Sequence, residues 1–141
     1  MSSTYNDIRA AIEGRLATQM AVSPAYPVSY QNVPFDPPNN TPWVEVFVRF
    51  GDNSYATLEA PSTGASFNRQ NGTLSVNVFT PIGVGTGANL TIAERIKDLF
   101  DRARFSGIIF DAASGPDPVD PSTPEAYYQT QLSATFEAYV D

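Results

Sequence analysis

The last segment of the chain, residues 126 to 140, alternates over fifteen positions between a mainly apolar face and a mainly polar one. A period of two is typical of a β-strand, and a strand this long needs partner strands beside it. The chain must therefore build a sheet large enough to hold it. The side chains expected on one face are Tyr128, Thr130, Leu132, Ala134, Phe136, Ala138 and Val140.

Two earlier segments, residues 43 to 50 and 73 to 80, alternate in the same way and predict two more strands. Gly51-Asp52-Asn53 tolerates positive φ, so we predict a hairpin turn there that leads into residues 54 to 59. Residues 60 to 71 predict a long loop. The predicted core face of the sheet comprises Val44, Val46, Val48, Leu74, Val76, Val78, Leu132 and Phe136.

Two segments, residues 4 to 21 and 88 to 104, have helical periodicity. Ser3 or Thr4 can cap the first helix. Together these elements predict an α+β fold in one domain over residues 1 to 141, with a single mixed or antiparallel sheet of four to five strands packed against both helices. The apolar stripes are Ile8, Ile12, Leu16 and Met20 in the first helix, and Ile92, Ile96, Leu99, Phe100 and Ala103 in the second.

The segment from Pro24 to Pro42 contains six prolines in nineteen residues, which excludes a helix and limits any strand to a short edge piece such as residues 28 to 33. We predict an extended arm with Val33 and Phe35 as its apolar anchors. Two interpretations stay open, since such an arm either covers the core of its own subunit or contacts a neighbouring one. A second proline-rich segment, residues 112 to 124, predicts a loop.

The chain has no Cys and no His, and its 141 residues carry eight basic and fifteen acidic side chains. The missing thiol and imidazole exclude Cys nucleophiles, His bases and the usual zinc and haem ligands. Residues 105 to 141 hold six acidic side chains and no basic one, which argues against tight nucleic-acid binding. We expect no membrane span, because no window approaches eighteen consecutive apolar residues, and no signal peptide, because the first twenty residues include Asp7, Arg9, Glu13 and Arg15.

Three motifs could carry chemistry, and each has a simpler explanation. Gly83-Val84-Gly85-Thr86-Gly87 lacks the ending of a P-loop and the spacing of a dinucleotide fingerprint, so we interpret it as a flexible connection. Asp98 with Asp101 lies on a solvated helix face, and Asp117 with Asp120 lies in a loop without the spacing of a calcium site. We predict no catalytic residue, no cofactor and no metal.

Large aromatic side chains occupy strand positions opposite the predicted core face, among them Trp43 and Phe47. A strand with apolar groups on both faces is covered on both, either by a helix of its own chain or by another subunit. Self-association is the simpler explanation. The candidate subunit or tube interface comprises Val33, Phe35, Trp43, Phe47, Phe67, Tyr127 and Tyr139.

A series of short motifs runs in order through residues 1 to about 104: Ile8-Arg9-Ala10-Ala11-Ile12-Glu13, Asn32-Val33-Pro34-Phe35, Thr41-Pro42-Trp43 and Val76-Asn77-Val78-Phe79-Thr80-Pro81, followed by the glycine-rich run. In the order and the sequence of these motifs, the chain resembles the tail terminator, or tail completion, proteins of long-tailed bacteriophages. Beyond Arg104 the resemblance is architectural.

The resemblance implies a structural virion protein rather than an enzyme. Such a protein assembles as a ring, expected to be a hexamer, at the head-proximal end of the tail, and it does so in the host cytoplasm. The ring caps the tail tube, ends its polymerisation and presents a surface for head-tail joining. Its partners would be its own copies, the tail tube protein and the head-tail connector protein. DNA would pass through the lumen without specific binding.

Two alternatives remain open from the sequence. One is another head-tail connector or a tail tube subunit. The other is a monomeric carbohydrate-binding or ligand-binding module that uses Trp43, Tyr127 and Tyr139 as stacking platforms. A monomer in light scattering would favour the binding module, whereas a position at the end of the tube would favour the terminator.

Overall fold

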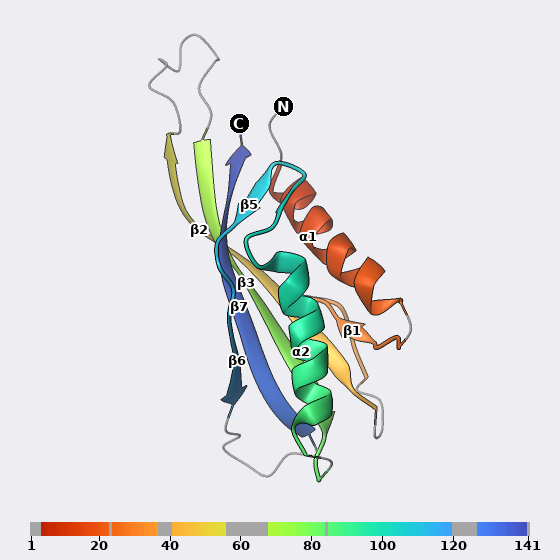
Figure 1. The fold of residues 1–141 in the computed structure, drawn as a ribbon. Coiled ribbons are helices and arrows are strands. Elements are labelled where there is room, and N and C mark those ends of the chain that lie inside the picture. The colour runs from red at the N-terminus through yellow and green to blue at the C-terminus, as the bar shows by residue number, and fades with distance from the viewer. Residues whose placement is uncertain are drawn as a thin grey trace.

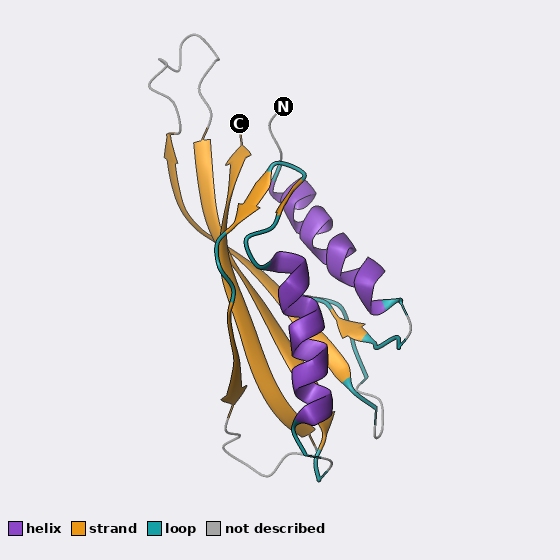
Figure 2. Ribbon diagram, viewed as in Figure 1, coloured by secondary structure: helices purple, strands orange, loops and turns teal. Residues whose placement is uncertain are grey.

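The structure, a computed structural model, describes residues 4–22, 24–36, 41–55, 68–83, 85–119 and 127–140. Within these ranges, two helices lie on one side of a twisted sheet of seven strands (Figures 1 and 2). The helices are α1 (Tyr5–Met20) and α2 (Gly87–Phe100), and the strands are β1 (Val28–Ser29), β2 (Trp43–Tyr55), β3 (Asn68–Pro81), β4 (Arg104–Phe105), β5 (Ile108–Phe110), β6 (Ser114–Val119) and β7 (Tyr127–Val140).

Three long strands form the centre of the sheet. β2, β3 and β7 pair antiparallel, and β1 joins the outer edge of β2 in parallel. On its other side β7 pairs with β5 and β6, and β4 pairs with β5, so the order is β1-β2-β3-β7-β5-β4 with β6 beside β7. The prediction of four to five strands was too low. Strands as short as β1, β4 and β5 carry too little alternation to be recognised in a sequence.

The predicted hairpin turn at Gly51-Asp52-Asn53 is wrong, because β2 continues through these residues to Tyr55. The register with β3 shifts between Phe50 and Asn53, which is the signature of a bulge or a similar irregularity. β3 begins at Asn68, so the end of the predicted loop over residues 60 to 71 is strand. Residues 56–67 lie outside the described part of the chain.

The side chain of Gln70 explains how β2 passes through residues that favour a turn. This side chain is 2% exposed. Its Nε2 donates to the carbonyl oxygens of Gly51 at 2.8 Å and Asn71 at 2.9 Å, and its Oε1 accepts from Asn53 Nδ2 and the Tyr5 hydroxyl at 3.0 Å. The buried amide thus satisfies polar groups that the irregular register leaves without ladder partners.

The predicted loop over residues 112 to 124 is wrong in part, because β6 occupies Ser114–Val119. Pro116 and Pro118 argued against a strand, since proline cannot donate to a ladder. They are tolerated because β6 lies at an edge of the sheet and pairs with β7 alone. Residues 120–124 lie outside the described ranges.

The apolar stripe of the first helix is confirmed, whereas the second helix ends earlier than predicted and leaves Ala103 of its predicted stripe outside α2. Thr4 caps α1 in a reciprocal capping box, in which its hydroxyl accepts from Asp7 N and its own N–H donates to the Asp7 carboxylate. α2 ends at Phe100 rather than near residue 104, because Asp101 adopts extended backbone angles. The Asp101 carboxylate then accepts from Ala113 N at 2.8 Å, which ties the end of α2 to the chain that leads into β6.

Two polar side chains of α2 fix the helix layer in place. Asn89 is fully buried, where its Nδ2 donates to Val78 O at 3.0 Å and its Oδ1 accepts from the Thr130 hydroxyl. It joins the start of the helix to β3 and β7. Arg95 donates to carbonyl oxygens at the end of α1, including Gln19 O at 2.6 Å and Val22 O at 2.9 Å. A cation at a helix C-terminus is favoured by the helix dipole.

All eight residues predicted for the core face of the sheet are buried. They form one cluster with the stripe of α1, with Ile92, Ala93, Ile96 and Phe100 of α2 and with Ile108 and Phe110 of β5. Strand β5 was only a short apolar run in the sequence. Its position beside β7 extends the core toward the end of the sheet that α1 covers (Figure 1).

Two glycines give a matched test of this packing. A Cβ added at Gly72 would lie 2.4 Å from Phe136 Cζ and 2.7 Å from Arg49 O, whereas one added at Gly14 meets nothing within 4 Å. We expect Gly72→Ala to lower the free energy of unfolding by about 1–3 kcal/mol through overpacking. Gly14→Ala, in the exposed middle of α1, should raise it by roughly 0.5–1 kcal/mol. Urea denaturation of both variants checks this, and equal midpoints would contradict it.

Candidate functional site

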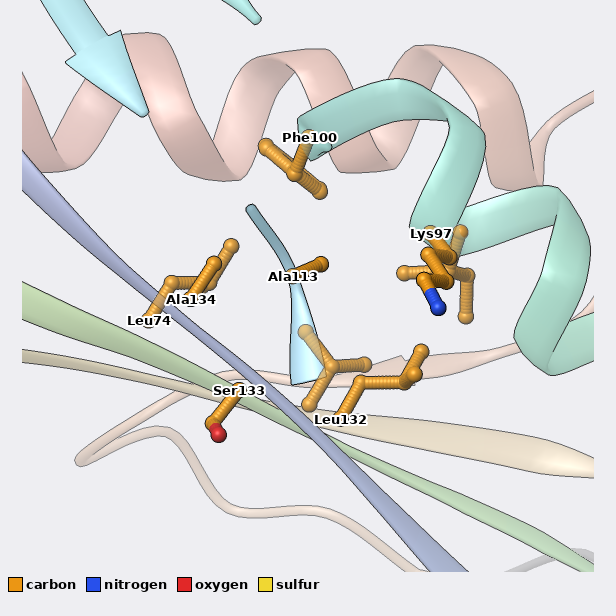
Figure 3. A pocket seen from close by; sticks show the side chains of 9 residues that line it. Leu74, Lys97, Phe100, Ala113, Leu132, Ser133 and Ala134 are labelled. Carbon is orange, nitrogen blue, oxygen red and sulfur yellow. The ribbon is translucent and has the colours of Figure 1, made fainter. Parts of the chain in front are cut away.

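The cavity between α2 and the sheet, as the described residues form it, is too small for a small molecule. A cavity of about 10 Å³ lies between α2 and the sheet, with Leu74, Phe100, Leu132 and Ala134 among its mostly apolar walls (Figure 3). Ligand pockets have volumes of roughly 300–1,000 Å³, so this void is a packing defect. Among the described residues, no group of three or more Asp and Glu side chains could hold a metal ion.

One sheet face is covered by the helices, and the opposite face, which we call the open face, carries several of the functional candidates. Register places Trp43, Glu45, Phe47 and Arg49 of β2 on it, because the residues between them are buried in the core. The neighbouring strands add a largely polar set to the same face: Thr73, Ser75, Asn77 and Phe79 from β3, and Gln129, Gln131, Ser133, Thr135 and Glu137 from β7.

At one end of the open face, Phe35, Trp43, Phe79 and Tyr127 form an aromatic cluster. The Trp43 and Phe79 rings stack with their centroids 4.1 Å apart and 7° between their planes. Phe35 lies 5.0 Å from Trp43, and Tyr127 meets it edge-on at 6.0 Å. These rings come from the arm and from each of the three long strands. The cluster is therefore a small second core, on the face that the helices do not cover.

Trp43 is the centre of the aromatic cluster and is 8% exposed. Its indole Nε1 is buried without a hydrogen-bond partner. A sugar-binding platform needs an exposed ring face, and Phe79 already stacks on this indole. The geometry thus argues against Trp43 as a sugar-binding platform and assigns it to holding strands and arm together.

The described part of the arm is attached to its own subunit. Pro27 O accepts from Val44 N at 3.0 Å, Gln31 Oε1 accepts from Val48 N at 2.7 Å, and Phe35 packs on Trp43. Tyr30 packs partly against the core, where burial and then the charge of Glu13 raise the pKa of its hydroxyl. Of the two interpretations of the arm, these contacts match the one in which it covers its own subunit. Residues 37–40 lie outside the described ranges.

The other candidate residues do not join the aromatic cluster. Val33 is 55% exposed beside an open groove of about 760 Å³ between α1 and the arm. Phe47 is half-buried on the open face, opposite Ser75. Tyr139 pairs with Arg69 in the register of β7, and nothing further is described of its side chain. Phe67 lies outside the described residues.

Phe79 was not among the predicted site residues. Its strand alternation places it opposite the core, on the same face as Ser75 and Asn77. That signal was present in the sequence. The sequence alone did not reveal the register of β2 against β3, which places Phe79 directly beside Trp43.

Fold and site together define a class: a small α+β protein with two helices on one face of a mixed sheet and an aromatic cluster on the other. The model of the phage tail terminator protein family matches residues 7–105 of the chain. The chain therefore belongs to that family. It is a structural family of the phage tail, which indicates a place in the virion tail and a role other than catalysis.

Solved structures agree with this fold. One solved chain is 26% identical, with a TM-score of 0.70 and coverage of 96% of this chain and 95% of its own. The similarity thus includes β5, β6 and β7, beyond the range of the family match. No curated protein matches the sequence. Neither described helix has the length and apolar content needed to cross a membrane.

Proposed function

We propose that the protein forms a closed ring at the head-proximal end of the tail tube, ends tube polymerisation there, and presents the surface to which the head connector binds. The proposal rests on family membership and on one observation of this chain. Its open face carries the half-buried ring of Phe47, and the described chain places no helix over this face.

Ring closure follows from the type of contact that such a face can make. In the proposed ring, the open face of one copy contacts a different surface of the next copy rather than that copy's own open face. Contacts between unlike surfaces generate closed rings when the rotation between copies closes. A closed ring stops growing at a fixed number of copies, expected to be six, and this property is what a terminator requires.

The charge distribution suits a ring through which DNA passes. Asp111 and Asp117 are exposed, and Glu137 is half-buried on the open face. With no basic residue after Arg104, this part of the chain cannot neutralise a series of phosphates. A duplex would therefore move past it without being held by counterion release.

Electron microscopy of tail tubes assembled with and without the purified protein tests the proposal. We expect tubes that stop at defined lengths and carry one ring of extra density at a single end. Extra density along the whole tube would instead support a tube subunit. A protein that stays monomeric in the presence of tubes would overturn the ring.

A further inference from the structure

The outer sides of β6 and of β2 are protected against further strand pairing in different ways. At one edge, two of the six residues of β6 are prolines, Pro116 and Pro118, which have no N–H to offer to another strand. Proline on an edge strand is a known device against unwanted strand pairing. On the opposite side of the sheet the end strand β1 pairs with only two residues of β2, and β2 itself contains no proline in its thirteen residues. The sequence of β2 therefore contains no proline that would prevent its outer side from pairing with another strand.

Part of the arm occupies the edge of β2 in this structure. The N–H groups of Val44 and Val48 point away from β3, since they donate to Pro27 O and to Gln31 Oε1. Strand geometry directs the N–H groups of Val46 and Phe50 the same way. β1 pairs with two residues of this edge, and farther along, the Gln31 amide takes the place of a strand carbonyl.

The edge beneath the arm is complementary to a second copy of itself. When β2 pairs antiparallel with its copy so that Phe47 faces Phe47, Val46 faces Val48 and Glu45 faces Arg49. The outward N–H groups of Val46 and Val48 then fall in hydrogen-bonded pairs. Both Glu–Arg pairs lie on the open face, where opposite charges on facing strands are stabilising.

We propose that β2 is an association site for a second copy of this chain and that arm residues 27–31 cover it in the free subunit. The contact is isologous and closes at two copies. It is therefore separate from the ring contact, which joins unlike surfaces. In the free subunit, the arm would block pairing between the β2 strands of two copies. Pairing through β2 would become possible only when the arm moves away from β2.

Cysteine cross-linking tests the register directly, because the chain contains no Cys. Val28→Ser with Gln31→Ala loosens the arm. In this background we expect Phe47→Cys to form a disulfide-linked dimer on a non-reducing gel. Residues 47 would face each other in a non-hydrogen-bonded pair with Cα atoms about 4.5 Å apart, within reach of a disulfide. With the arm intact, the cross-link should form several-fold more slowly.

Position controls make the test specific. Glu45→Cys and Arg49→Cys are each expected to lose the cross-link, because neither residue faces its own copy in this register. Mixing the two variants should restore it. A ring contact between unlike surfaces would not single out residue 47. Equal cross-linking at positions 45, 47 and 49, or none at 47 in the loosened background, would overturn the proposal.

Charge exchange gives an independent readout by analytical ultracentrifugation in the loosened background without cysteines. Glu45→Arg alone and Arg49→Glu alone each place like charges opposite one another, so each should weaken dimerisation on the order of tenfold. The double exchange should restore it, and a mixture of the two single variants should form heterodimers. A control change at exposed Gln131→Ala should have no effect. Dimers insensitive to both charge changes, or a loosened chain that stays monomeric, would overturn the site.

Discussion

Phe100→Ala should lower the free energy of unfolding by about 3–5 kcal/mol, a larger loss than the one expected for Gly72→Ala. Phe100 is 2% exposed at the end of α2, with its ring centroid 5.3 Å from that of Phe110 and 6.2 Å from that of Phe105. It also lines the small cavity between α2 and the sheet. Removing the ring enlarges an existing apolar void, and a void of this kind stays dry.

Phe100→Leu is the matched control for this prediction. Leucine keeps most of the volume and all of the apolar character, so its cost should stay near or below roughly 1.5 kcal/mol. Urea denaturation with fluorescence detection measures both variants against the parent protein. An unchanged midpoint for the alanine variant would show that the ring is not part of the folding core.

The core could be predicted because its signals are local. Ile8, Ile12, Leu16 and Met20 recur every four residues, and the valines of β2 recur every two. Each period assigns a face to its own element before any partner is known. The helices and the three long strands follow from these periods, and so does the buried side of the sheet.

The elements that escaped prediction depend on partners distant in the sequence. β6 contains two prolines, and it is a strand because Asp117, Pro118 and Val119 align with β7. Gly51-Asp52-Asn53 favours a turn locally, and the buried amide of Gln70, nineteen residues away from Gly51, keeps it in a strand. Such long-range contacts overrule local preference and leave no periodic trace in the sequence.

The sequence predicted which aromatic residues lie opposite the core, but it did not predict which of them contact one another. Alternation showed that Trp43 and Tyr127 lie opposite the core, and the arm supplied Phe35. Their meeting with Phe79 depends on strand register, which is decided by pairing across the sheet. The same register separates Phe47 from the aromatic cluster and leaves it on the open face, where another subunit can reach it.

This separation decides which substitution can test the ring. Trp43→Asp would place a charge in the aromatic cluster, where burial of an unpaired charge disrupts folding itself. Phe47 is half-buried and faces Ser75 across the strand pair, so a carboxylate at this position can reach water. Phe47→Asp should therefore fold and yet lose the apolar contact with a neighbouring subunit.

We expect Phe47→Asp to abolish tail completion while its melting temperature stays close to that of the parent protein. Burial of an aromatic side chain contributes about 25 cal/mol per Å², and each subunit of a ring repeats the contact, so the loss is multiplied around the ring. Leu90→Asp, an apolar-to-acidic change at an exposed position of α2, is the control and should leave completion unchanged. Complementation of a phage that lacks the protein, with electron microscopy of its tails, measures both variants. Normal tails with Phe47→Asp would show that the ring is joined through another surface, because a carboxylate cannot replace an aromatic ring buried between subunits.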